Sequence, residues 1–285
     1  MPPVFESVLR VQCSCGCDFL LRFVMRSADA LVLRSVDFSE TSRIVTLYTR
    51  QFGKIEALAK GGRRIKGPFE SSLDLLARNA VVFIAKRGDV LDLLTESKLI
   101  RRFRVQPSNL AGTFGGFYVA ELINAATALG DPMPPLYDLT VKVLRQLEEG
   151  TFVMRTLIRF EGRMCQLIGQ APSLRNCVGC NVSIPRQPNV RIVFGTLDGG
   201  VLCSDCLSGF RQTLTLTAET LDAWETLINP LDRTESWKYA SITPQTLATI
   251  RRLANQYVCN LLGNKPRLHD WWNIIAKNDK NTQER

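Results

Sequence analysis

The chain has 285 residues, of which 45% are hydrophobic and 22% are charged. This length suffices for two ordinary domains with a sizeable core, and the composition is that of a globular protein. No apolar run reaches the roughly 18 residues of a membrane helix, and Arg22 interrupts the short apolar stretch near the N-terminus. That stretch therefore also fails as the core of a signal peptide, and we expect a cytoplasmic protein.

The formal net charge is +9, and the basic residues are concentrated in the first third of the chain. Residues 25–104 hold 16 Lys and Arg against 9 Asp and Glu, whereas residues 105–285 hold 18 against 16. This asymmetry indicates a polyanionic partner such as nucleic acid. A generally basic protein without such a partner is the alternative.

Residues 1–24 carry balanced charge and no clear periodicity. We interpret them either as a disordered extension or as a mistaken upstream start, with the true start at Met25. Three cysteines at residues 13, 15 and 17 lack a fourth nearby ligand, so a metal site there is disfavoured.

Short β-strands are predicted from Ala28 to Arg104. In residues 43–49 two sets of side chains alternate, as expected for a strand with two distinct faces. Turn residues separate the runs, including a Gly-Asp hairpin turn at residues 88–89, and such a series favours a small β-barrel. The predicted strands are residues 30–33, 43–49, 54–60, 73–76, 81–86 and 90–95.

Helices are predicted after Pro107, where the apolar residues take helical spacing. We expect a barrel domain over residues 25–104, a mainly helical domain over residues 105–275 and a flexible polar tail over residues 276–285. The fold class is therefore α+β. The predicted helices are residues 110–129, 136–147, 153–168, 218–228 and 244–262, with a shorter piece near Trp271.

Four of the nine cysteines form two Cys-x-x-Cys pairs, separated by 22 residues. Each pair supplies two thiolates that converge on one point, and zinc takes four soft ligands in a tetrahedron. We predict one Zn²⁺ in a module at about residues 175–210, supported by a hairpin from Arg191 to Gly200. Four protein ligands leave no open position, so the site would be structural; free or disulfide-bonded pairs are the alternative. The predicted ligands are Cys177, Cys180, Cys203 and Cys206.

A glycine-rich basic loop, Lys-Gly-Gly-Arg-Arg-Ile-Lys-Gly at residues 60–67, joins two predicted strands. Glycines allow the backbone to approach a phosphate closely, and the cations suit a polyanion, although a solvated surface loop is the alternative. A second basic cluster follows the last strand. Candidates for base stacking are Phe38, Tyr48, Phe52 and Phe69, although most aromatic residues of a small barrel lie in its core. The predicted nucleic-acid contacts are Arg43, Lys54, Lys60, Arg63, Arg64, Lys66, Arg101, Arg102 and Arg104.

Catalysis has little support in the sequence. His269 is the only histidine, and Asp89 and Asp92 flank a turn without acidic companions. Both a histidine-based mechanism and a two-metal nuclease are therefore disfavoured, and we predict no catalytic residue and no enzyme.

Several segments in order resemble the N-terminal domain of the RecO family. They include Asp-Phe-Ser-Glu-Thr-Ser at residues 37–42, Gly-Lys-Ile at residues 53–55 and Ala-Lys-Gly-Gly-Arg-Arg at residues 59–64. Tyr-Val-Ala-Glu-Leu at residues 118–122 and the four-cysteine module resemble the rest of that family.

This resemblance implies an OB-fold at residues 25–104 that binds single- and double-stranded DNA, and a helical domain with structural zinc. It further implies strand annealing, and loading of RecA together with RecR on DNA coated by single-strand-binding protein (SSB). Capture of the SSB tail would need a cation near an apolar groove, with Lys142, Arg145, Arg159 and Arg163 as candidates. The location would be the bacterial cytoplasm, in association with the nucleoid. The alternative is a zinc-stabilised adaptor that binds only proteins.

Overall fold

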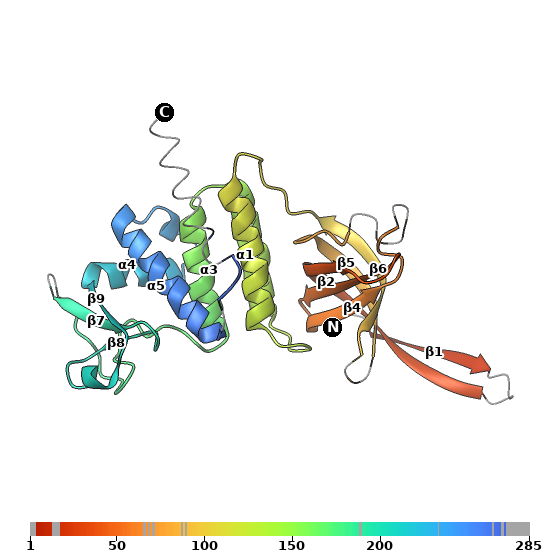
Figure 1. Cartoon of the computed structure of the whole chain (residues 1–285), viewed down its shortest axis with the longest axis horizontal. Coiled ribbons are helices and arrows are strands. Elements are labelled where there is room, and N and C mark those ends of the chain that lie inside the picture. The colour runs from red at the N-terminus through yellow and green to blue at the C-terminus, as the bar shows by residue number, and fades with distance from the viewer. Residues whose placement is uncertain are drawn as a thin grey trace. The chain divides into compact units, whose positions relative to one another are not determined.

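A computed structural model of the chain describes residues 4–12 and 18–271, with gaps at 65–66, 68, 70–71, 87, 89, 188–189, 233, 264 and 269–270. Up to residue 23 it describes the backbone alone. The chain divides into two compact units (Figure 1). The first comprises Met1–Arg104 and Val119–Val141, and the second comprises Val105–Tyr118 and Lys142–Arg285.

Five strands of the first unit close into a barrel. β2 pairs with both β3 and β5, β4 runs parallel to β6, and β5 pairs with β6, so that the order β2-β3-β4-β6-β5 returns to β2. This closed five-stranded topology is that of the OB-fold and confirms the predicted barrel. The strands are β2 (Asp18–Asp37), β3 (Arg43–Thr49), β4 (Gly53–Ala59), β5 (Arg78–Ala85) and β6 (Asp92–Arg101).

The barrel core is built from alternate positions of the strands. Val45 and Leu47 of β3 and Ile55 and Ala57 of β4 are buried together, as the alternating pattern predicts. Phe83 of β5 is fully buried in the same cluster. The intervening residues of β3 and β4 therefore face outward.

Residues 73–76 do not form the strand that their apolar sequence predicts. They lie in turns, and Leu76 has a positive φ of 62°. Leu73 and Leu76 are nevertheless buried, and the backbone of Leu76 bonds to Val32. Leu73 belongs to the barrel core cluster, whereas Leu75 is 39% exposed. Leucines that are buried from a turn, without strand pairing, therefore account for the strand-like sequence.

Residues 4–12 form β1 (Val4–Gln12), which pairs with the first part of β2 from Asp18 to Arg26 (Figure 1). This hairpin replaces the disorder predicted for the extension. Its strands contain several valine and phenylalanine residues, which favour extended backbone, and each strand supplies the other's hydrogen-bonding partners. The three cysteines at residues 13, 15 and 17 lie outside the described residues. A start at Met25 stays a prediction.

The second unit holds most of the helices and a small sheet. Thr217 and Thr243 accept hydrogen bonds from Thr220 and Thr246, which caps the N-termini of α4 and α5. Its core includes Trp224. The elements are α1 (Leu110–Ala126) and α2 (Pro134–Glu149), each contributing to both units, α3 (Val153–Leu167), α4 (Ala218–Ile228), α5 (Pro244–Leu262), β7 (Arg191–Gly195), β8 (Gly200–Leu202) and β9 (Thr213–Thr217).

The helices at residues 218–228 and 244–262 and the hairpin between the cysteine pairs are confirmed, whereas β9 was not predicted. The expected tail at residues 276–285 and His269 lie outside the described residues. No helix in the described part of the chain combines the length and apolarity that a membrane span needs.

Candidate nucleic-acid interface and metal centre

Asp37 joins the end of β2 to the basic loop. Its carboxylate accepts from Nε of Arg43 at 3.0 Å and lies 3.3 Å from Nε of Arg63. Arg63 also donates from Nη1 to the carbonyl of Ser39 at 2.8 Å, and its backbone N–H donates to the carbonyl of Thr41 at 3.1 Å. These bonds tie the loop at residues 38–42 to the basic loop. The sequence did not single out Asp37, because its role depends on two strands meeting.

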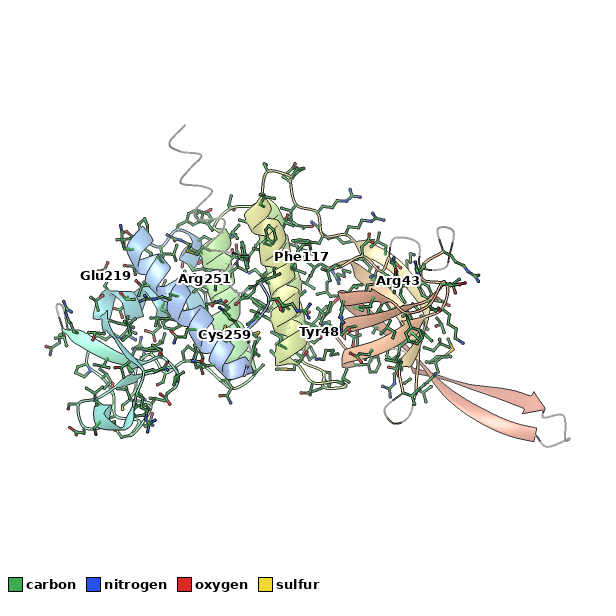
Figure 2. All side chains as sticks on the ribbon, viewed as in Figure 1. Arg43, Tyr48, Phe117, Glu219, Arg251 and Cys259 are labelled. Carbon is green, nitrogen blue, oxygen red and sulfur yellow. The ribbon has the colours of Figure 1, made fainter. Side chains whose placement is uncertain are left out.

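Four predicted cations gather at this end of the barrel, which carries Arg43 (Figure 2). Lys60 and Arg64 are exposed, and neither has a hydrogen bond or ion pair from its side chain among the described residues. Lys66 lies outside the described residues. We call Arg43, Lys60, Arg63 and Arg64 the basic rim. The carboxylate of Asp37 pairs with Arg43 and Arg63. It balances one of the four positive charges of the rim, which therefore keeps an excess of positive charge.

Lys54 lies at the other end of the same face and does not join the rim. Its ammonium donates to the carbonyl of Asn124 at 2.6 Å, and burial lowers its pKa. Tyr48 donates to the carbonyl of Met133 at 3.4 Å in the same region. Residues 124–133 therefore cover this end of the outer face of β3 and β4, which makes Lys54 a structural contact.

The first turns of α2, which follow the covering segment of residues 124–133, are fixed to the barrel by polar and charged groups. Asp29 accepts from the hydroxyl of Tyr137 at 2.7 Å and forms an ion pair with Arg78. Arg50 makes a two-pronged ion pair with Asp138, at 2.9 and 3.0 Å, which holds the pKa of that carboxyl below its usual value. The open part of the face is consequently the end that carries the basic rim.

The second basic cluster lies elsewhere on the barrel. Leu94 of β6 is paired with Ala59, next to the rim, and Arg101 follows seven residues later on the same strand. Extended backbone advances about 3.3 Å per residue, so the separation is on the order of 20 Å. Arg102 lies 3.8 Å from Asp74, and Arg104 is exposed. The structure does not bring the two clusters together.

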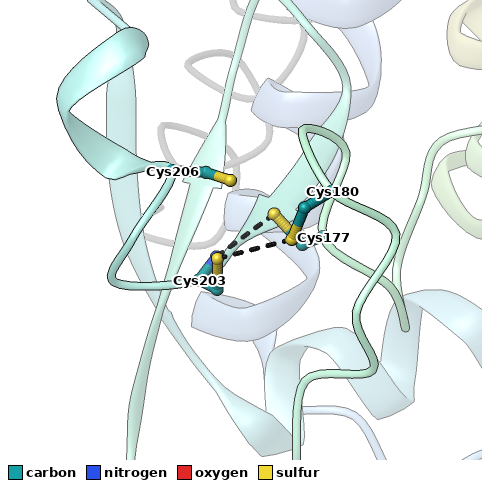
Figure 3. Close-up of side chains that lie close together, drawn as sticks. All are labelled: Cys177, Cys180, Cys203 and Cys206. Atoms are coloured by element: carbon teal, nitrogen blue, oxygen red, sulfur yellow. Dashed lines mark hydrogen bonds between the residues drawn. The ribbon is translucent and has the colours of Figure 1, made fainter.

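The four cysteines of the two pairs meet in one place (Figure 3). Their sulfur atoms all lie within 4.8 Å of one another, and those of Cys180 and Cys203 are 3.7 Å apart. A tetrahedron with Zn–S bonds of about 2.3 Å needs sulfur atoms about 3.8 Å apart, so this donor set fits zinc. All four are free thiols, and the disulfide alternative does not hold.

Backbone hydrogen bonds shape the turn that carries Cys177 and Cys180. Cys177 donates its N–H to the carbonyl of Val182, and Asn181, at a positive φ of 62°, returns an N–H to the carbonyl of Cys177. A Cβ on Gly179 would lie 3.1 Å from the sulfur of Cys206, so a glycine here lets the two turns approach each other. Gly179 itself has an ordinary φ, and the positive φ belongs to Asn181.

The thiol of Cys177 has a lowered pKa, which favours its ionised form. Burial raises the pKa of Cys177, but backbone N–H groups of Cys203, Cys180 and Gly179 outweigh this effect and lower the pKa to about 6. The N–H of Cys203 is 3.4 Å from its sulfur, and Figure 3 marks this contact. Since metals bind the thiolate, this environment favours ligation.

Residues 25–103 match the protein family described as Recombination protein O N terminal, and residues 107–269 match Recombination protein O C terminal. The chain belongs to the RecO family.

Curated relatives agree with this assignment. The DNA repair protein RecO of Rhodopirellula baltica is 37% identical over 259 residues, covering 84% of this chain and 96% of the relative. Those of Syntrophus aciditrophicus and Halalkalibacterium halodurans are each 28% identical, over 83% and 82% of this chain and 91% and 89% of the relatives. The RecO N-terminal match includes the whole basic rim, and the RecO C-terminal match includes all four cysteines.

Proposed function

We propose that this RecO chain binds single- and double-stranded DNA through the basic rim of its OB-fold and anneals complementary strands. The observation that carries the proposal is the gathering of four cations at the open end of a barrel type that binds oligonucleotides on this face. A rim of this kind contacts phosphates, so binding should be largely indifferent to sequence and should weaken as salt rises.

Annealing brings two polyanions together, and the cations of the rim lower the repulsion between them. No bond is made or broken in this process. The chain acts as a recombination mediator by binding and not by catalysis. With RecR and the C-terminal tail of SSB as partners, it helps to load RecA on SSB-coated DNA.

The four-cysteine cluster holds one zinc ion in this proposal, and the metal stabilises the fold. The cluster is linked to α4 by ion pairs of Arg175 and Arg186 with Glu225, at 2.5 and 2.9 Å. Four thiolates complete the tetrahedron, so zinc supplies rigidity and no reaction step.

Arg145 is the preferred cation for the acidic SSB tail among the four candidates. Lys142 pairs with Glu235, Arg159 donates to the carbonyl of Leu227, and Arg163 donates to Gln166. Arg145 is exposed on α2, and its side chain has no partner among the described residues. Calorimetry with a tail peptide should lose heat of binding in Arg145→Ala and keep it in Arg163→Ala.

A fluorescence titration with single-stranded DNA, with and without SSB, tests the main proposal. We expect salt-dependent binding of naked DNA, binding to SSB-coated DNA, and faster annealing of complementary oligonucleotides. The alternative, an adaptor that binds only proteins, predicts binding to SSB but none to naked DNA at any salt concentration.

A further inference from the structure

Three apolar side chains form a row across the outer face of the barrel at its open end. The register pairs Val36 of β2 with Ile44 of β3, and Ile44 with Leu58 of β4. Their strand neighbours Val45 and Ala57 point into the core, so the three paired residues face outward. We call Val36, Ile44 and Leu58 the apolar row.

This row is accessible in the first unit, unlike the other end of the same face. Val36 is 41% exposed, and Ile44 and Leu58 are partly exposed. Tyr48, four residues beyond Ile44 on the same outward side of β3, is fully buried beneath the covering segment. A strand with one side in the core usually has a polar outer face. The apolar row on the outer face therefore indicates that a binding partner contacts it.

Phe38 extends this row from the loop that follows β2. It comes two residues after Val36, and it is 62% exposed. Its N–H donates to the carbonyl of Ser42 at 3.0 Å, and Arg63 bonds to the carbonyls of Ser39 and Thr41 in the same loop. A large ring is therefore held in water on a loop whose backbone is already ordered.

The other three aromatic candidates for stacking are not available. Tyr48 and Phe69 are buried in the first unit. Phe52 is partly buried, and its ring packs edge-on against Phe83 with 5.7 Å between centroids. Phe38 is thus the one candidate of the four with an exposed ring, and it adjoins the basic rim.

We propose that Phe38 stacks on a base of single-stranded DNA, and that the apolar row contacts the neighbouring base while the basic rim binds the phosphates. This inference rests on the proposed function and adds a preference for single-stranded over double-stranded DNA. A single strand presents its base faces, whereas a duplex hides them in the stack. Phe38 and the apolar row therefore select single strands, and the rim binds either form.

Two oligonucleotides of about 12 nucleotides separate base contacts from phosphate contacts. One is oligothymidylate, and the other has the same length and charge but carries abasic sites throughout. We expect the chain to bind oligothymidylate more tightly, and Phe38→Ala to lose about tenfold in affinity for it. Phe38→Ala should leave affinity for the abasic strand and the slope of affinity against salt unchanged.

Phe38→Trp should restore the preference, because tryptophan also stacks. Ile100→Ala is the matched control, since Ile100 is 51% exposed at the far end of β6. It should behave as the unmodified chain. Circular dichroism of each variant verifies that the fold is intact, as expected for changes at exposed side chains.

Equal binding of the two oligonucleotides by the unmodified chain, or a Phe38→Ala variant that keeps the preference, would overturn the inference. In both cases salt-dependent DNA binding would persist, and the proposed function would stand. Failure of the chain to bind either oligonucleotide would overturn the proposed function together with the inference. If Phe38→Ala instead lost binding to SSB and kept its binding to both oligonucleotides, this surface would bind a protein partner. That result would also overturn the inference.

Discussion

Arg251 and Glu161 form an ion pair inside the second unit, with 2.5 Å between Nη1 and Oε1 and with side chains only 6% and 1% exposed. The hydroxyl of Tyr118 donates to the same oxygen at 2.6 Å, and Asn255 donates to that hydroxyl at 3.1 Å. Burial raises the pKa of Tyr118, so the hydroxyl keeps its proton and remains a donor. Figure 2 shows Arg251 on α5.

Removal of one partner should destabilise the fold strongly. Arg251→Met leaves the Glu161 carboxylate buried without its counter-charge, and we expect a loss of about 3–5 kcal/mol in the free energy of unfolding. Replacing both, with Glu161→Leu and Arg251→Met, should recover much of that loss, because no buried charge remains. Urea unfolding of the two single variants and the double variant measures this. If the double variant lost as much free energy of unfolding as the two single variants together, this prediction would be contradicted.

The sequence predicts those elements that depend on residues close together in the chain. The two cysteine pairs and the helix of residues 244–262 follow from the spacing of residues along the chain. The strand predicted at residues 73–76 is wrong, because leucines are also buried when they lie in a turn, as Leu73 and Leu76 are. The sequence predicts Lys54 as a DNA contact and offers Tyr48 as a stacking candidate, because no local feature reveals the segment that covers them.

The zinc prediction concerns stability. Replacing Cys203 with Ser removes one of four ligands, so zinc affinity should fall and the melting temperature should drop. We expect one zinc per unmodified chain by elemental analysis, and little change in DNA affinity for Cys203→Ser at a temperature where it stays folded. Cys259→Ser, at a cysteine outside the cluster, is the control and should keep its zinc. A zinc-free preparation that was never exposed to chelator would refute the site.

Gly53→Ala should disturb the contact between the barrel and its covering segment. Gly53 has a φ of 69°, and an added Cβ would lie 2.1 Å from the carbonyl oxygen of Asp131. Gly88→Ala is the matched control, because Gly88 has a φ of 75° and no other described residue lies within 4 Å of the added atom. Both variants bear the cost of a left-handed alanine, about 1–2 kcal/mol. Overlap with Asp131 should make Gly53→Ala less stable than the control by about a further 1–3 kcal/mol in urea unfolding. Equal losses would show that Asp131 moves freely.

A chain that starts at Met25 should fold and bind DNA like the full chain. The truncation removes β1 and the part of β2 that pairs mainly with it, whereas the pairing of β2 with β5 runs from Val24 to Leu31. The barrel ring therefore loses only the pairing of Val24 with Ala85 and keeps the pairs from Met25 to Leu31. Thermal unfolding and a DNA titration compare the two chains. A weaker affinity for the truncated chain, at unchanged stability, would assign DNA contacts to the hairpin.

The prediction that decides the DNA-binding site concerns Arg63 and Arg64. Each phosphate contact to a single strand adds about 0.7 to the slope of log affinity against log salt. Arg64→Ala removes an exposed cation with no partner among the described residues, so it should flatten the slope by about 0.7 and leave stability unchanged. Lys98→Ala, on the exposed side of β6, makes the same change in net charge and should leave the slope as it was.

Arg63→Ala also loosens the loop at residues 38–42, because Arg63 bonds to Ser39 and Asp37. The double variant of Arg63 and Arg64 should therefore flatten the slope by about 1–1.5 and weaken binding to all sequences alike. Strand annealing should slow in parallel, since the same cations screen both strands. If the double variant kept its affinity and its slope, the loop would be a solvated turn. The phosphate contacts would then have to come from Arg101, Arg102 and Arg104, about 20 Å away along β6.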